Sequence, residues 1–261
     1  MDTKNIKPSI PEHSYFIGFS YADGHLQDST RNRGKFSIEL KADDSDILEE
    51  FSLLFSEVNP SISFRQRDTN FSKDYRSCCF RICSREFRDN LKSIGFHSGK
   101  KSYDISMPDG AIRVDYIRGL IDGDGSIGFT AKRFPFVSFV TVSKKCSEEY
   151  IEFLYSVTGK RKTTTRNKRD RAFNIAVYKE DAQAVTKALY YEGCLSLKRK
   201  HRSAIEVMSW ERPGNMRIAF SRKRWTKEQD EFIKHHSVEE SMLALDRTKS
   251  SVKTHLWRLN K

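Results

Sequence analysis

The sequence contains no apolar run that approaches the roughly 18 residues needed to cross a membrane. Its opening segment, MDTKNIKPSI, has neither an apolar core nor an Arg/Ser-rich amphipathic pattern, so we expect no signal or transit peptide. The five cysteines include no CxxC pair and lack the spacing of a disulfide framework. We therefore expect reduced, buried thiols and an intracellular protein, in the cytoplasm of a bacterial or phage-infected cell or in an organelle.

Positive charge is the strongest feature of the composition. The 261 residues include 47 lysines and arginines against 35 aspartates and glutamates, a formal net charge of +12. A content of 37% hydrophobic and 12% aromatic residues is typical of a globular protein with a sizeable core. Such an excess of positive charge indicates a polyanionic partner, and without a membrane-binding segment we expect nucleic acid.

Two segments repeat one pattern, FIGFSYADG at 16–24 and IRGLIDGDG at 117–125. Each is an apolar helical run that ends in Asp-Gly and carries small residues four positions apart on one face. Such a stripe lets two helix backbones approach closely. The expected interface residues are Gly18, Ala22, Gly119 and Gly123. Parallel pairing of these helices would bring their C-terminal aspartates, Asp23 and Asp124, side by side.

Two carboxylates at this point repel each other, and the helix dipoles add partial negative charge there. A divalent cation relieves the conflict, and oxygen ligands select Mg²⁺, with Mn²⁺ or Ca²⁺ expected to occupy the same site. Asp23 and Asp124 are the predicted metal ligands. Gly24 and Gly125, at C′ positions of the helices, are candidate backbone ligands, and Tyr21 is assigned none. A metal held between two acids is suited to phosphodiester hydrolysis.

The segments around the motifs follow one order in both halves of the chain, helix–strand–strand–helix–strand–strand–helix. The predicted strands include 35–40, 64–67 and 75–83 in the first half and 136–142, 159–166 and 172–178 in the second. The later helices are expected to begin near Asp44 and to span 84–95 in the first half, and to begin near Cys146 and to span 179–193 in the second. A basic cluster then closes each half, where Lys100 and Lys198 are expected to stabilise charge near a scissile phosphate.

A Pro-Gly segment near 211–217 precedes a distinct tail. The tail is predicted to form three short helices at about 226–235, 237–245 and 248–259, with Thr226, Ser237 and Thr248 as caps. Its expected core comprises Trp225, Phe232, Leu243, Leu245, Val252, Leu256 and Leu259. The chain is thus predicted to hold a first lobe at 1–110, a second lobe at 111–212 and a third domain at 213–261.

The two motifs resemble those of the LAGLIDADG homing endonucleases in their two-motif, single-chain form, over roughly residues 9–205. The match rests on the central Gly, the terminal Asp-Gly and the apolar positions, whereas the sixth motif position is Tyr21 in one copy and Asp122 in the other. The resemblance implies an α+β fold of two pseudo-symmetric αββαββα lobes that form a DNA-binding saddle. It also implies that Asp23 and Asp124 are the metal-binding catalytic acids, supported by Lys198 and by Lys100 or Lys101.

The tail resembles a Myb/SANT-like or homeodomain-like helix-turn-helix, through RWTKEQDEFI and LDRTKSSVKTHLWRL. This resemblance implies a small all-α domain whose third helix enters the major groove.

Basic residues on one face of each sheet, in the segment 159–171 and in the tail are the candidate DNA contacts. They are Arg31, Arg33, Lys35, Arg65, Arg67 and Arg76 in the first lobe, Arg161, Arg166, Lys168, Arg169 and Arg171 in the second, and Arg224, Lys249, Ser250, Lys253 and Thr254 in the tail.

The leading hypothesis is a monomeric, Mg²⁺-dependent, site-specific homing endonuclease, free-standing or intron-encoded, that makes a staggered break in double-stranded DNA. Its target should be long and asymmetric, because the two lobes differ strongly in sequence. Two alternatives remain open: an intron-splicing maturase that uses the same surface on RNA, and a non-cleaving DNA-binding regulator. The paired acids disfavour the regulator.

Overall fold

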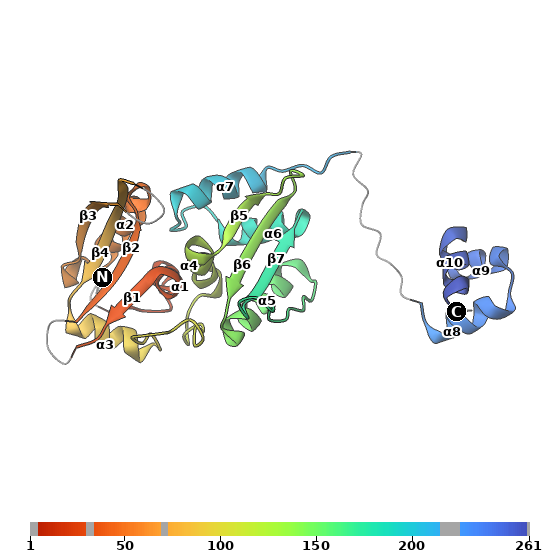
Figure 1. Ribbon diagram of the computed structural model, residues 1–261, viewed down its shortest axis with the longest axis horizontal. Helices are drawn as coiled ribbons and strands as arrows, with labels where there is room; N and C mark the ends of the chain where they lie inside the picture. The colour runs from red at the N-terminus through yellow and green to blue at the C-terminus, as the bar shows by residue number, and fades with distance from the viewer. Residues whose placement is uncertain (1–4, 30–33, 69–72, 215–224, 260–261) are drawn as a thin grey trace. The chain divides into compact units, whose positions relative to one another are not determined.

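The computed structural model describes residues 5–29, 34–68, 73–214 and 225–259, and the chain divides into two compact units, Met1–Arg212 and Pro213–Lys261 (Figure 1). The candidate contacts Arg31, Arg33 and Arg224 lie outside the described residues. No helix within the described ranges is both long enough and apolar enough to span a membrane. All five cysteines are free thiols, and Cys78, Cys79 and Cys146 are buried; the expected intracellular location stays a prediction.

The first lobe contains a four-stranded antiparallel sheet in the order β1-β2-β4-β3. Its elements are α1 (Pro11–Asp23), β1 (Gly24–Gln27), β2 (Lys35–Lys41), a 3-10 turn (Ala42–Asp44), α2 (Ser45–Leu54), a second 3-10 turn (Ser56–Val58), β3 (Ser61–Arg67), β4 (Tyr75–Ile82) and α3 (Arg85–Ser93). Phenylalanines from the helices and the sheet form the core, where the Phe16 ring lies 4.6 Å from Phe55 and 5.0 Å from Phe51. The predicted order of helices and strands is confirmed in this lobe.

The second lobe contains a three-stranded antiparallel sheet in the order β5-β6-β7. Its elements are α4 (Arg113–Asp124), β5 (Ser126–Phe129), β6 (Pro135–Thr141), α5 (Lys144–Thr158), β7 (Phe173–Tyr178), α6 (Glu180–Leu189) and α7 (Lys198–Met208). The strand predicted at 159–166, and with it the full αββαββα order, is wrong here, since only Arg166 forms a bridge, with Phe173.

Composition and hydrogen bonding account for the missing strand. The segment 159–171 carries seven basic residues and one acidic residue, and its lysines, Gly159, Asn167 and Asp170 are residue types that are depleted in strands. Instead, the side chains of Lys162 and Thr164 donate to the backbone oxygens of Ala176 and Asn174, at 2.9 and 3.5 Å. The segment therefore follows the edge of β7 through side chains and not through a backbone ladder.

The motif helices α1 and α4 lie side by side between the two sheets (Figure 1). A Cβ on Gly18 would lie 2.0 Å from the Tyr116 carbonyl oxygen, and one on Gly119 would lie 2.2 Å from the Tyr15 oxygen. Nearer the C-terminal ends, a Cβ on Gly123 would lie 2.3 Å from that of Ala22. The first two contacts lie near the middle of both helices and the third lies near both C-terminal ends, so the pair is parallel and its small residues form the interface.

The second unit contains α8 (Lys227–His235), α9 (Val238–Leu245) and α10 (Lys249–Leu259). The hydroxyls of Thr226, Ser237 and Thr248 each accept a backbone N–H three residues further on, as the predicted caps require. Val252 is buried as expected, but Leu243 is 88% exposed. Its assignment to the core is wrong because Ser241 and Leu245, one helical turn apart, take the inner face of α9.

We expect Gly18→Ala to destabilise the larger unit by about 2 to 3 kcal/mol, because its methyl group would overlap the backbone of α4. Chemical denaturation of the full chain would measure this loss. Gly128→Ala is the matched control, since its Cβ would find the Phe136 ring at an ordinary contact distance of 3.8 Å. Equal stability of the two variants would contradict the close helix approach.

Candidate active site

The parallel helices α1 and α4 both end on an aspartate. Asp23 closes α1 and Asp124 closes α4, and the carboxylate Oδ2 of Asp23 lies 3.2 Å from where a Cβ of Gly123 would stand. Gly24 and Gly125 follow in extended conformations, with φ of −78° and −89°, so neither is the left-handed C′ glycine expected at a helix end. The structure thus brings the two acids together where the chain leaves each helix for its sheet.

Burial and mutual repulsion act on this pair of carboxylates. Loss of hydration, followed by the negative charge of Asp124, raises the pKa of Asp23 to about 6. Loss of hydration also raises the pKa of Asp124, although nearby lysines oppose it. Both residues are nevertheless exposed to solvent. Two accessible acids that resist ionisation together favour a cationic ligand.

Two lysines occupy equivalent positions beside the acids. The Lys101 ammonium donates to the carbonyl oxygen of Gly24 at 2.5 Å, and the Lys200 ammonium donates to the carbonyl oxygen of Gly125. Lys200 also donates to the Ile121 oxygen at 3.1 Å. Burial lowers the pKa of Lys200 to about 8 against the attraction of the surrounding aspartates, and it lowers the pKa of Lys101 as well. Each lobe therefore supplies one acid and one partly desolvated lysine.

Of the lysines named from the sequence, Lys101 lies at the acids, whereas Lys100 and Lys198 do not. Lys100 is exposed, and Lys198 lies on the surface, 2.6 Å from Asp46 of α2. The error is a matter of helix phase: Lys198 begins α7, and Lys200, two residues later, faces the opposite way into the protein. In the first lobe, Lys101 lies outside the helices, and of the two lysines named it is the one whose ammonium reaches Gly24 beside the acids.

The residues at the sixth motif positions, Asp122 and Tyr21, are buried and have structural partners. Asp122 is fully buried and accepts hydrogen bonds from the Tyr15 and Tyr190 hydroxyls and, at 2.7 Å, from the Leu197 backbone N–H. It thereby ties α4 to α1 and to the start of α7. Tyr21, its counterpart, is buried against the Phe96 ring, and it offers no ligand at the acids.

Within the described residues there is no group of three or more His, Cys, Asp or Glu side chains suited to a metal ion. A cation at this site would rest on Asp23 and Asp124, with further oxygens from water or a bound phosphate. The residues fit a hard divalent cation, because the donors are carboxylate oxygens; burial raises the pKa of both acids, and the charge of Asp124 raises that of Asp23 further. The backbone oxygens of Gly24 and Gly125 already accept from the two lysines.

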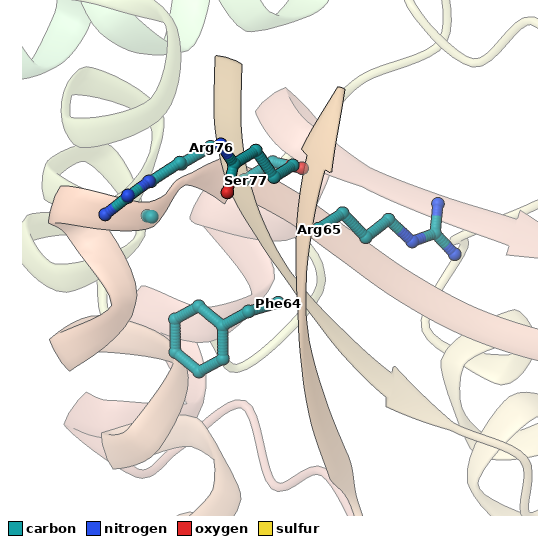
Figure 2. A pocket seen from close by; sticks show the side chains of 6 residues that line it. Phe64, Arg65, Arg76 and Ser77 are labelled. Carbon is teal, nitrogen blue, oxygen red and sulfur yellow. The ribbon is translucent and has the colours of Figure 1, made fainter. Parts of the chain in front are cut away.

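Strand parity decides which basic residues share the open face of the first sheet. Arg65 stands opposite Ser77 in the ladder, so both point to one face, and Arg76 points to the other. Figure 2 shows Arg65 and Arg76 on opposite sides of β3 and β4, with Phe64 and Arg76 on the side of the helices. The prediction that Arg76 lies with Arg65 and Arg67 is therefore wrong, whereas Lys35 does share their face.

Sequence reasoning also missed two residues on this open face. Arg81 stands opposite Ser37 and Ser61, and its buried Nε has no hydrogen-bond partner among the described residues. Glu39 lies beside Arg65 and Arg67. Arg81 follows by alternation from Ser77, the residue opposite Arg65, and this pairing is set by the register of the two strands.

The other basic candidates lie outside regular strands. In the second lobe, Arg161 stacks on Tyr155, Arg166 donates to the backbone oxygen of Arg171, Arg169 pairs with Asp170, and Lys168 is exposed. On α10, Lys249 pairs with Glu239 at 2.9 Å. Ser250, Lys253 and Thr254 are exposed at helical spacing, opposite the buried Val252.

The fold of the larger unit is similar to that of solved homing endonucleases. A mesophilic variant of I-DmoI superposes with a TM-score of 0.51 and 14% identity, over 77% of this chain and 100% of that one. I-WcaI, bound to its DNA recognition sequence, gives a TM-score of 0.50 and 13% identity over 77% and 90% of the two chains. No family model matches the sequence, and no curated protein does. At these identities the likeness establishes the fold.

The raised pKa of Asp23 has a direct test. Carboxyl NMR titration should give a midpoint near 6 in place of the ordinary 3.8, and Asp124→Asn should lower it by removing a neighbouring negative charge. A midpoint near 4 in both proteins would contradict the site.

The same shift predicts how stability depends on pH. The pKa of Asp23 is higher in the folded state than in the unfolded state, so its protonated carboxyl contributes stability below about pH 4. This contribution is lost as the pH rises through about 6. Asp23→Asn should therefore raise the free energy of unfolding above pH 6. Denaturation at pH 4 and pH 7 would measure the difference.

Proposed function

We propose that this protein is a site-specific DNA endonuclease that depends on a divalent metal and makes a staggered double-strand break. The observation that carries the proposal is the meeting of Asp23 and Asp124 at the ends of a parallel helix pair, each with a lysine at the following glycine. One acid and one lysine per lobe suit the hydrolysis of one phosphodiester in each of two strands. The shared fold with homing endonucleases and the net charge of +12 support a DNA substrate.

The proposed roles follow from charge and position. Asp23 and Asp124 would hold Mg²⁺ or Mn²⁺, which when bound activates water and stabilises negative charge on the scissile phosphate. Lys101 and Lys200 place positive charge beside the acids, and their hydrogen bonds to Gly24 and Gly125 hold the ammonium groups in place. This fixed charge favours the developing charge of the transition state.

Differences between the lobes support an asymmetric target and a monomeric enzyme. The first lobe presents charged strand residues such as Arg65 and Arg67, whereas the second carries its positive charge in the irregular segment 159–171. The tail would act as a helix-turn-helix, with Ser250, Lys253 and Thr254 of α10 toward the major groove. Tethering adds affinity through this second contact.

Cleavage of a randomised plasmid library with Mg²⁺ tests the proposal. A recurrent long cut site should appear, and Asp23→Asn/Asp124→Asn should reduce cleavage at least about 100-fold while DNA binding persists, because the acids act on the reaction and not on the duplex. Asp46→Asn is the control, since it removes a carboxylate that pairs with the surface Lys198. Retained binding of DNA or RNA without any cutting would favour the regulator or the maturase.

Deletion of 213–261 tests the tail. The first unit is compact without it, so the truncated protein should fold and bind the same site more weakly. The slope of log affinity against log salt should fall by about one for each phosphate that the tail neutralises in the full chain. An unchanged slope would mean that the tail takes no part in DNA binding.

A further inference from the structure

Glu39 is a carboxylate on the face of the first sheet that carries its cations. It stands opposite Cys79 of β4, which in turn stands opposite Ser63 of β3. Residues paired in register share a face, and alternate residues along β3 place Arg65 and Arg67 on that same side. The other face of the sheet is covered by the helices, and its side chains belong to the buried core. Glu39 is thus directed away from the helices, toward the open surface.

Three side chains converge on this carboxylate. The Arg67 Nη2 lies 3.1 Å from Oε1 of Glu39, and the Arg65 Nη1 lies 3.9 Å from Oε2. The Ser77 hydroxyl donates to Oε1 at 2.7 Å. The Glu39 side chain is 34% exposed, against 45% for Arg65 and 54% for Arg67. Both arginine side chains are therefore more accessible to a ligand at this face than the carboxylate that holds them.

A carboxylate here is unfavourable for simple attraction of a polyanion, because it cancels one positive charge. The same carboxylate is favourable for orienting the guanidinium groups. A guanidinium carries five N–H donors in a planar fork, so an ion pair that uses one or two of them leaves others for a ligand while it restricts the side chain. Reading a guanine requires such orientation, since two parallel bonds must reach O6 and N7 together. Phosphate contacts make no such demand.

We propose that Glu39 is a specificity-determining positioning residue, which holds Arg65 and Arg67 so that they read guanine in the half of the target bound by the first lobe. The inference rests on the proposed function, namely recognition of double-stranded DNA. The second lobe offers the contrast: β5, β6 and β7 contain no lysine or arginine, and their outward residues include Val140, Asn174 and Tyr178. The guanine preference that depends on Glu39 is therefore confined to one half of the target.

Selection from a randomised duplex library tests this assignment. The full chain with Asp23→Asn/Asp124→Asn serves as the binding-only parent, and Glu39→Gln, Glu39→Ala and Arg65→Ala/Arg67→Ala are added to it. The arginine variant identifies the guanines in question. Both Glu39 variants should reduce preference for the same guanines by about tenfold, leave the other half of the site unchanged, and bind random DNA at least as tightly.

Asp181→Asn is the matched control, because it removes a carboxylate of the second lobe that pairs with Lys160 at 2.6 Å. It should leave the guanine preference intact. Thermal unfolding of every variant separates loss of orientation from loss of fold, and the two different substitutions at Glu39 must agree.

Two results would overturn the inference while DNA binding stands. An unchanged base preference with uniformly tighter binding would show that Glu39 acts only by weakening the attraction to DNA through its negative charge. Loss of a cytosine preference, with the guanines retained, would make Glu39 a direct reader of the cytosine amino group. Failure of the parent to enrich any duplex would instead contradict the proposed function itself.

Discussion

The close approach of two glycine-bearing helices is the constraint on which the rest of the larger unit depends. Gly18 and Gly119 leave each backbone within contact of the other, so α1 and α4 can run parallel and end together. Both lobes then attach to the same pair, and the buried Asp122 reinforces it through the Tyr15 hydroxyl. A bulkier residue at either glycine would separate the helix ends, and with them Asp23 and Asp124. Packing at the interface thus sets the chemistry at its end.

That packing creates an electrostatic cost at the place where function is proposed. Asp23 and Asp124 stand at the negative ends of two helix dipoles, and the pKa of both carboxyls is raised. Lys101 and Lys200 offset part of this charge, and hydrogen bonds to the carbonyl oxygens of Gly24 and Gly125 hold their ammonium groups beside the acids. The lysines are themselves poorly hydrated. A cation and a phosphate added at the surface would balance charges that protein packing alone leaves unbalanced.

Local chemistry made the motif helices and most strands predictable. Three of the signals are local patterns of residues close together in the chain: the Asp-Gly ends, the small-residue stripe and period-two alternation. From them, α1, α4, β2 and β4 follow from the sequence. The failures depend on phase or on neighbours. Lys198 and Lys200 differ only in which way α7 turns them, and the parity of β4 sends Arg76 to the helix side. The segment 159–171 is rich in residue types that are depleted in strands, and it is held along β7 by the side chains of Lys162 and Thr164.

The two lobes share an internal frame and differ at their surfaces, and this difference has a physical origin. The helix pair must remain nearly symmetric, because each glycine packs against the backbone of the other helix. Nothing in that packing constrains the outer faces. The first sheet carries a charged cluster around Glu39, ordered by ion pairs on regular strands. The second carries uncharged strand residues beside a basic segment anchored by Lys162 and Thr164. The symmetric helix pair can therefore place two equivalent acids at the DNA, while the two different sheet surfaces contact the two different halves of the target.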